Sequence, residues 1–221
     1  MTDDINERLK ATDATYVPVA SEYAPMLSTH HVSSRSDLFI SAKTTTAIPA
    51  RHPLVRNALI QASLDPKVRA LAFVPTATVG TAQVALKGVV VVRDDGRFHL
   101  DVVEARPMRD VEVEGLALIA LDNLGLTPLT LTAADIKREP RFANARVVWD
   151  YRMHAVGIEM RMRILTVLQE DGPLQLGCLL KRVRSVRNPA PAVLALVCSD
   201  LVELDLVSQP LGFSTIARSR A

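Results

Sequence analysis

The sequence is poor in aromatic residues and in cysteine. Aromatic side chains make up 4% of its 221 residues, whereas hydrophobic residues make up 48%. A chain of this length and apolar content can bury a core, and that core has to be mainly aliphatic. The two cysteines, Cys178 and Cys198, lie in apolar runs, so we expect two buried free thiols rather than a disulfide.

Signatures of several enzyme classes and of export are also missing. The sequence contains no phosphate-binding P-loop, no dinucleotide fingerprint, no Gly-x-Ser-x-Gly and no paired Cys-x-x-Cys. It has no apolar run of about 18 residues, and its acidic, polar start is unlike a signal peptide. We therefore expect a cytoplasmic protein with no membrane partner. The formal net charge of +2 does not by itself predict binding to nucleic acid.

The chain divides into three parts by composition. Residues 1–45 are polar and show no sustained periodicity, which predicts a partly disordered N-terminal arm. Residues 46–151 alternate between helical and strand patterns, and residues 152–221 are mainly helical. We expect an α/β domain followed by a small helical domain.

A β-hairpin is the clearest local signal in the α/β part. A long β-branched run at residues 84–92 is followed by Asp95-Gly96 and by a second strand pattern at residues 98–106. Further patterns predict helices at 53–64, 111–124, 132–136 and 144–151, strands at 68–74 and 129–131, and a loop at 75–80. This order predicts a mixed sheet flanked by helices.

The last third follows a different order. Helical patterns at 160–170, 176–186 and 190–201 precede strand patterns at 202–207 and 213–217. Three short helices before a hairpin are typical of a winged-helix-like domain. The third helix is almost wholly apolar, so we do not expect it to read DNA bases.

The hairpin and its neighbours resemble the TnsA-like endonucleases of Tn7-type transposons, which share the fold of restriction endonucleases. The similar segments, in chain order, are residues 53–56, 65–68, 86–88, 95–96, 103–107, 131–136 and 141–146. The resemblance extends over roughly residues 50–205 and implies a restriction-endonuclease-like sheet followed by a winged-helix-like domain.

The resemblance also implies a degenerate active site. Active members of the family follow the PD-(D/E)xK pattern and bind a divalent metal through a helix glutamate, a Pro-Asp and a Glu-x-Lys. Here Val55 or a neighbour, Lys87-Gly88 and Arg106 stand at three of these places, which leaves Glu104 as the remaining carboxylate. One carboxylate cannot hold Mg²⁺ against its hydration shell, and arginine does not exchange protons as lysine can. We expect no metal or other cofactor, with Glu104 and Arg106 on one face of the second hairpin strand.

Basic residues are concentrated in the last part of the chain. Residues 151–221 hold nine Lys or Arg against six Asp or Glu. Such side chains can pair with DNA phosphates or can form a solvated helix face. The candidate nucleic-acid contacts are Lys87, Arg161, Arg163, Lys181, Arg182, Arg184 and Arg187.

Three functions follow from this reading. The first is a catalytically inactive TnsA-like protein that binds DNA or joins protein partners in a transposition-type complex. The second is an active Mg²⁺-dependent DNA endonuclease with a relocated metal site, for which Asp94 and Asp95 in the hairpin turn and Asp101 on the second strand are the candidate carboxylates. The third is a protein-interaction or regulatory module with no nucleic-acid role.

Overall fold

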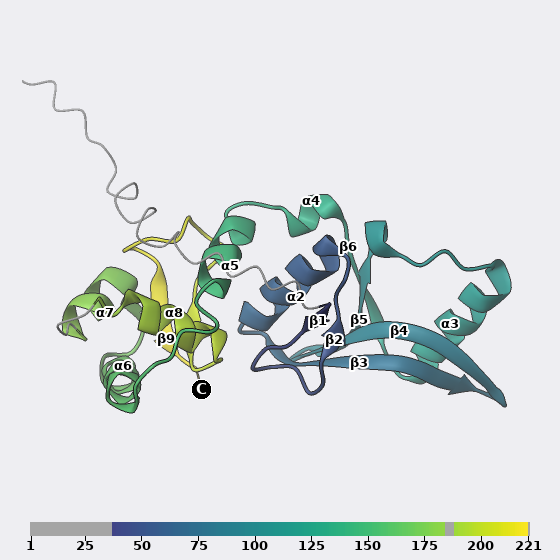
Figure 1. The fold of residues 1–221 in the computed structure, drawn as a ribbon, viewed down its shortest axis with the longest axis horizontal. Helices are drawn as coiled ribbons and strands as arrows, with labels where there is room; N and C mark the ends of the chain where they lie inside the picture. Colours follow the sequence, from purple (N-terminus) through teal and green to yellow (C-terminus); the bar gives the residue numbers. More distant parts are fainter. Residues whose placement is uncertain (1–36, 184–187, 221) are drawn as a thin grey trace, which may run out of the picture. The chain divides into compact units, whose positions relative to one another are not determined.

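A computed structural model describes residues 37–183 and 188–220 of the chain. Its first part contains β1 (Leu38–Phe39), β2 (Ile48–Pro49), α2 (Pro53–Leu64), β3 (Val68–Val79), β4 (Ala82–Arg93), β5 (Gly96–Val102), the 3₁₀ turn η1 (Val103–Ala105), α3 (Val111–Asn123), β6 (Thr127–Leu131), α4 (Ala133–Ile136) and α5 (Arg141–Trp149). Its second part contains α6 (Ile158–Asp171), β7 (Leu174–Gln175), α7 (Leu176–Arg182), α8 (Ala190–Cys198), β8 (Val202–Leu204) and β9 (Ile216–Ser219). Figure 1 shows their arrangement.

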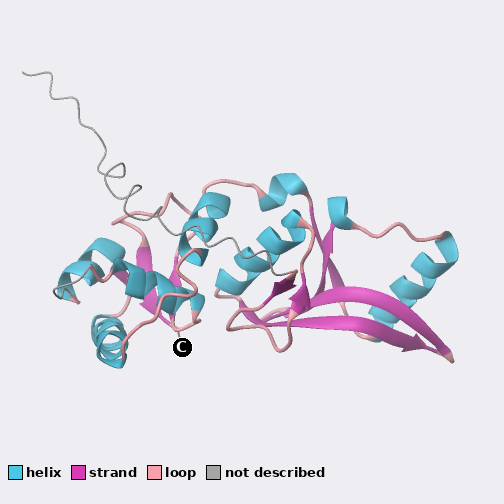
Figure 2. Ribbon diagram, viewed as in Figure 1, coloured by secondary structure: helices cyan, strands magenta, loops and turns pink. Residues whose placement is uncertain are grey.

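A four-stranded mixed sheet in the order β3-β4-β5-β6 forms the centre of the first part (Figure 2). The pairs β3–β4 and β4–β5 are antiparallel, and β6 runs parallel to β5 after the crossover through α3. Val90 packs in the cluster beneath α3, whereas its neighbour Val91 lines a cavity with Ala58 of α2. Because successive strand residues point to opposite faces, α2 and α3 cover opposite faces of the sheet. The expected mixed α/β sheet flanked by helices is confirmed.

The strand β3 is longer than the sequence pattern predicts. It continues through Pro75 to Val79, so the loop expected at residues 75–80 is wrong. The register shifts between Val74 and Thr76, where one β3 residue faces Leu86 and Lys87 of β4. This bulge accommodates a proline that cannot donate a ladder hydrogen bond. Because β3 pairs with β4 again from Thr76, the strand continues beyond Pro75.

The strand β5 is shorter than predicted. It ends at Val102, and Val103–Ala105 forms a 3₁₀ turn in place of the strand expected to continue to residue 106. The alternation of side chains that a regular strand imposes therefore stops before Glu104.

The second part has a small antiparallel sheet of its own in the order β7-β9-β8. Every residue of α8 except Pro191 is buried, and the thiol of Cys198 donates to the carbonyl of Val148 in α5 at 3.2 Å. Burial raises the pKa of the Cys198 thiol to about 12. Cys178 is exposed on α7, so the expectation that it is buried is wrong. Leu176 and Leu179 turn the other side of that helix inward.

Side chains of α5 join the two parts. The buried Asn144 donates to the carbonyls of Leu206 and Gln209 and accepts from the amide of Leu211 at 2.8 Å. Within the first part, the buried Trp149 stacks on Phe39 with ring centroids 5.2 Å apart. The boundary between the two predicted domains stays a prediction.

The predicted N-terminal arm falls largely outside the described residues. Residues 1–36 are among those not described, whereas residues 37–45 contain β1 and an isolated bridge from Thr44 to Leu71 of β3. Within the part of the chain that the structure describes, no helix has the length and hydrophobicity needed to cross a membrane.

Candidate functional site: the centre at the end of β5

The centre predicted from the family resemblance lies where β4 and β5 end their pairing. Val89 pairs with Leu100, so Gly88 and Asp101 follow at the end of this ladder. Glu104 comes from the 3₁₀ turn directly after β5, and Arg106 follows that turn. The sheet register and the turn therefore position the side chains of this centre.

Asp101 is held by an arginine and a threonine. Arg106 donates to its carboxylate through Nε at 2.8 Å and through Nη2 at 2.5 Å. Thr130 of β6 donates its hydroxyl at 3.1 Å. These contacts, that of Arg106 above all, hold the pKa of Asp101 below its ordinary value. The Arg106 guanidinium therefore neutralises the carboxylate of Asp101, which is the one nearest to Gly88 at the end of the ladder.

Glu104 has a structural partner. Its Oε1 accepts the backbone N–H of Ala133, the first residue of α4, at 2.7 Å. The amide groups of a first helical turn have no acceptor within the helix, and a carboxylate satisfies one of them. Thr132 and Asp135 complete the same turn with a reciprocal capping box.

Glu104 and Arg106 consequently do not lie on one face of a strand, as was expected. That expectation assumed a strand as far as residue 106, and the 3₁₀ turn directs Glu104 toward α4 and Arg106 toward Asp101. The turn thus separates the two residues by giving each a different partner.

His99 occupies the space beside Gly88. A Cβ at position 88 would lie 2.9 Å from Cδ2 and 3.0 Å from Nε2 of the His99 ring, so any larger residue at 88 requires that ring to move. The imidazole is half-buried, and this burial lowers its pKa. Sequence analysis missed His99, although glycine inside a strand pattern often marks a close approach of another group.

The carboxylates considered for a relocated metal site are each paired with an arginine. Asp94 pairs with Arg69, and Asp95 pairs with Arg93 at 3.1 Å. Asp101 pairs with Arg106 as described. Among the described residues, no group of three or more His, Cys, Asp or Glu side chains could hold a metal ion. The donor set around Glu104 therefore does not fit Mg²⁺, which needs several oxygen ligands in a near-octahedral arrangement.

The candidate nucleic-acid contacts divide between two regions. Lys87 lies exposed in the bulge of β4 with a backbone φ of 49°, whereas the others that the structure describes lie on α6 and α7 (Figure 1). The candidate nucleic-acid contacts that the structure describes therefore do not all lie on neighbouring helices.

The cations of α6 and α7 differ in their partners. Arg163 pairs with Glu159 at 2.7 Å, and Arg182 pairs with Asp171. Lys181 is exposed. Arg161 is half-buried, and its Nε has no hydrogen-bond acceptor among the described residues. Arg184 and Arg187 lie outside the described residues.

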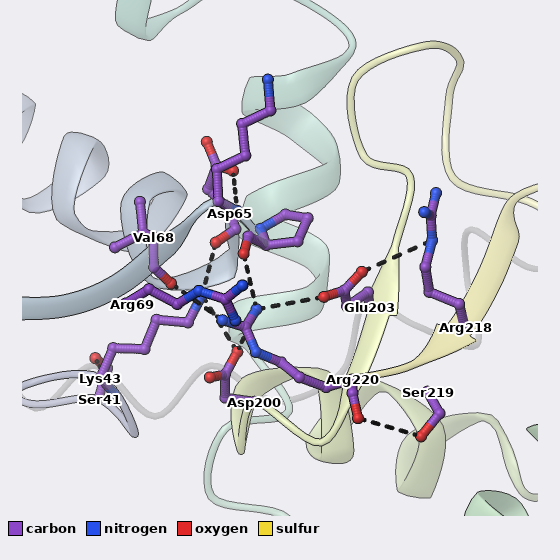
Figure 3. A network of polar contacts seen from close by, with 12 residues as sticks. Ser41, Lys43, Asp65, Val68, Arg69, Asp200, Glu203, Arg218, Ser219 and Arg220 are labelled. Carbon is purple, nitrogen blue, oxygen red and sulfur yellow. Dashed lines mark hydrogen bonds and ion pairs between the residues drawn. The ribbon is translucent and has the colours of Figure 1, made fainter. Parts of the chain in front are cut away.

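A second polar cluster, which sequence analysis missed, joins the C-terminal strand to the start of β3 (Figure 3). Arg220 donates to the carbonyls of Pro66 at 3.0 Å and Val68 at 3.3 Å. Its Nη1 also lies 3.2 Å from Asp200 and 3.4 Å from Glu203. The Arg220 side chain is 10% exposed, so its charge is compensated almost entirely within the protein.

Lys43 completes this cluster from the segment before β2. Its side chain is 2% exposed, and its Nζ donates to the carbonyl of Asp65 at 2.6 Å and lies 3.2 Å from Asp200. Asp65 is the C-cap of α2, where a cation is favourable. Burial lowers the pKa of Lys43, and the nearby Asp200 opposes this change. We call Lys43, Asp200, Glu203 and Arg220 the junction cluster.

No protein-family model matches the chain, and no curated protein is significantly similar to it in sequence.

Proposed function

We propose that this protein is a catalytically inactive nuclease-fold protein that binds DNA through its phosphates, as one partner in a transposition-type complex. The observation that carries the proposal is that the carboxylates of Asp101 and Glu104 already accept hydrogen bonds from other groups of the protein. Arg106 and Thr130 hold the first carboxylate, and the amide of Ala133 holds the second. A centre arranged in this way lacks the free oxygen ligands that Mg²⁺-dependent cleavage requires.

The order of elements supports a restriction-endonuclease-like core. A helix, three antiparallel strands, a second helix and a parallel strand follow one another as α2, β3 to β5, α3 and β6. Of the segments similar to TnsA-like proteins, residues 86–88 lie in β4 and residues 103–107 follow directly after β5. In active members of that family, the resemblance implies that metal-binding residues stand in these segments.

The second part supports a winged-helix-like module. Its order is α6, β7, α7, α8, β8 and β9, with β9 central in the small sheet. The third helix of such a module usually enters the DNA groove, but α8 is buried along almost its whole length. Contact through exposed cations such as Lys181 therefore fits better than base reading by α8.

Anisotropy of a fluorescent duplex tests DNA binding by the full chain. We expect binding at about 50 mM NaCl that weakens steeply toward about 200 mM, because each phosphate contact releases counterions. Lys181→Glu should weaken binding about 5-fold or more at the lower salt concentration and should reduce the salt slope.

Lys67→Glu is the matched control, because Lys67 is exposed in the turn after α2 and the change in charge is the same. It should retain most of the affinity. Absence of binding by the wild-type protein at low salt would overturn the proposal, and an equal loss in both variants would refute the role of α7.

A further inference from the structure

A cavity of about 110 Å³ lies where α2, the sheet, α4 and the start of α5 meet (Figure 1). Val91 of β4 lines it, whereas the neighbouring Val90 packs beneath α3, so the cavity lies on the α2 face of the sheet. Protein interiors rarely leave a space this much larger than a water molecule. The cavity is therefore a candidate binding site for a small molecule.

The floor of this cavity is apolar. Its buried apolar side chains come from α2, α4 and three strands, and they are Ala58, Val68, Val91, Leu100 and Ile136. A cavity of about 150 Å³ in another protein holds benzene, which corresponds to about 25 Å³ for each carbon. A space of about 110 Å³ therefore accommodates about four carbon atoms, which is the size of a small branched aliphatic group.

Charged side chains of both signs form the rim of the cavity. Asp65, Arg93, Asp135 and Arg141 line it, and all four are half-buried rather than buried. The two carboxylates and the two guanidiniums balance one another. Because an unpaired charge is costly in a partly buried place, such a rim favours a ligand that is neutral overall, including one that carries both charges.

The two arginines of the rim have N–H groups available for a ligand. Arg93 donates from Nη2 to Asp95 at 3.2 Å, but its buried Nε, 3.1 Å from the other oxygen of Asp95, is not aligned with a hydrogen-bond acceptor in the described part of the chain. Arg141 donates from Nη2 to Asp65 at a long 3.4 Å. A guanidinium has five N–H donors, so both arginines can also donate to a ligand carboxylate.

The two carboxylates of the rim differ in how firmly they are held. Asp135 accepts from the hydroxyl of Thr132 at 2.7 Å and from Arg138 at 2.9 Å. One oxygen of Asp65 accepts a backbone amide at 3.0 Å, whereas the other meets Arg141 at 3.4 Å. The Asp65 and Arg141 side chains are 28% and 38% exposed, so a ligand can reach both. A ligand with an ammonium and a carboxylate can therefore replace this long contact with two shorter ones.

We propose that the cavity binds a small aliphatic α-amino acid of about the size of valine. Its carboxylate accepts from Arg141 and from Nε of Arg93, and its ammonium group donates to Asp65. Its side chain packs on the apolar floor, which includes Val91 and Leu100. This ligand satisfies both signs of charge at the rim without adding net charge. The site does not depend on DNA binding or on the state of the centre at Glu104.

Isothermal titration calorimetry of the full chain tests the proposal. L-alanine, L-valine and L-leucine are titrated, beside isovalerate, which is valine without its amino group, and isobutylamine, which is valine without its carboxylate. We expect at least one of the three amino acids, L-valine above all, to bind with a dissociation constant below about 1 mM. Each analogue should bind at least about 10-fold more weakly than L-valine, because it leaves one charge of the rim unmatched.

Two variants of the lining locate the site. Arg141→Met removes a donor to the carboxylate and should weaken L-valine binding at least about 10-fold. Ala62→Leu extends a side chain of α2 into the space and should abolish measurable binding. Arg218→Met is the matched control, because Arg218 is also exposed and paired with a carboxylate but does not line the cavity. It should bind as the wild type does.

Circular dichroism should show that the variants are folded, and Arg141→Met decides alone if Ala62→Leu is not. The proposal is overturned if none of the amino acids binds the wild type up to about 10 mM. It is also overturned if isovalerate or isobutylamine binds as tightly as L-valine, or if Arg141→Met binds L-valine as tightly as Arg218→Met does.

Discussion

Two aspartate–arginine clusters in this protein differ in the exposure of their arginine side chain. At the end of β5, the Arg106 side chain is largely exposed where it pairs with Asp101. In the junction cluster, Arg220 is largely buried between Asp200, Glu203 and two backbone carbonyls. Exposed ion pairs contribute little to stability, whereas removal of one member of a buried pair leaves an uncompensated charge. The comparison indicates a structural role for the junction cluster and a centre at β5 that is neutralised without being essential for folding.

The largest expected effect comes from breaking the junction cluster. Arg220→Met leaves Asp200 and Glu203 without their buried partner and removes the donor to Pro66 and Val68. We expect a loss of about 3 kcal/mol in the free energy of unfolding, measured by urea denaturation followed by circular dichroism.

Arg218→Met is the control, two residues before Arg220 and on β9. Arg218 is 55% exposed and lies 3.7 Å from Glu203, so its loss should cost less than about 1 kcal/mol. Arg106→Met should cost clearly less than Arg220→Met, because Arg106 is exposed and Thr130 still donates to the Asp101 carboxylate. If the three variants unfold at the same urea concentration, the distinction between the clusters is wrong.

The contact between Gly88 and His99 should give the next largest effect. Gly88→Ala places a methyl group within 3 Å of the imidazole, and we expect about 1–2 kcal/mol of destabilisation from overpacking. In a His99→Ala background the same change should cost clearly less, which a double-mutant cycle in urea measures. Additive costs would show that the ring does not limit the space at position 88.

Loss of the contact between Glu104 and α4 should be smaller. Glu104→Ala leaves the Ala133 amide without its acceptor and should cost about 1 kcal/mol in urea unfolding. Glu104→Gln retains an acceptor oxygen and should lose less. Glu170→Ala, an exposed position on α6, is the control and should be nearly neutral. A neutral Glu104→Ala would contradict the structural role of this carboxylate.

The smallest effect concerns pH. Burial lowers the pKa of His99, so between that lowered value and the ordinary value near 6.5 the unfolded chain binds more protons. The contribution of His99 to the free energy of unfolding is therefore constant above that window and falls as pH drops through it. The charged groups near the ring are Asp101, Arg109 and Glu114.

Urea midpoints between about pH 7.5 and 5 measure this effect. His99→Gln should lose less stability on acidification than the wild type, because its amide does not titrate. Identical pH profiles for the two proteins would show that His99 has the same pKa in both states.

Local signals identified most of the elements. Pro53 and Asp65-Pro66 delimit α2 because proline suits a first helical turn and excludes the residue before it from a helix. Asp95-Gly96 marks the turn between β4 and β5, and Thr132 marks the start of α4. These features depend on residues close together in the sequence, which is why sequence patterns predict them.

Features that depend on distant residues were missed. The path of β3 beyond Pro75 depends on pairing with β4, and the position of Glu104 depends on an amide of α4. The space beside Gly88 depends on how β4 and β5 are aligned, which no local pattern specifies. Similarly, Arg220 meets the carbonyl of Pro66 only after the second part packs against the first.

Nicking of a supercoiled plasmid tests the proposed lack of catalysis most directly. The full chain is incubated with plasmid at a DNA-saturating concentration, with Mg²⁺ or Mn²⁺, beside the Glu104→Ala variant. We predict no nicking above the level of the variant, because Asp101 and Glu104 are engaged by Arg106 and Ala133. Metal-dependent nicking by the wild type that disappears in Glu104→Ala would contradict the account.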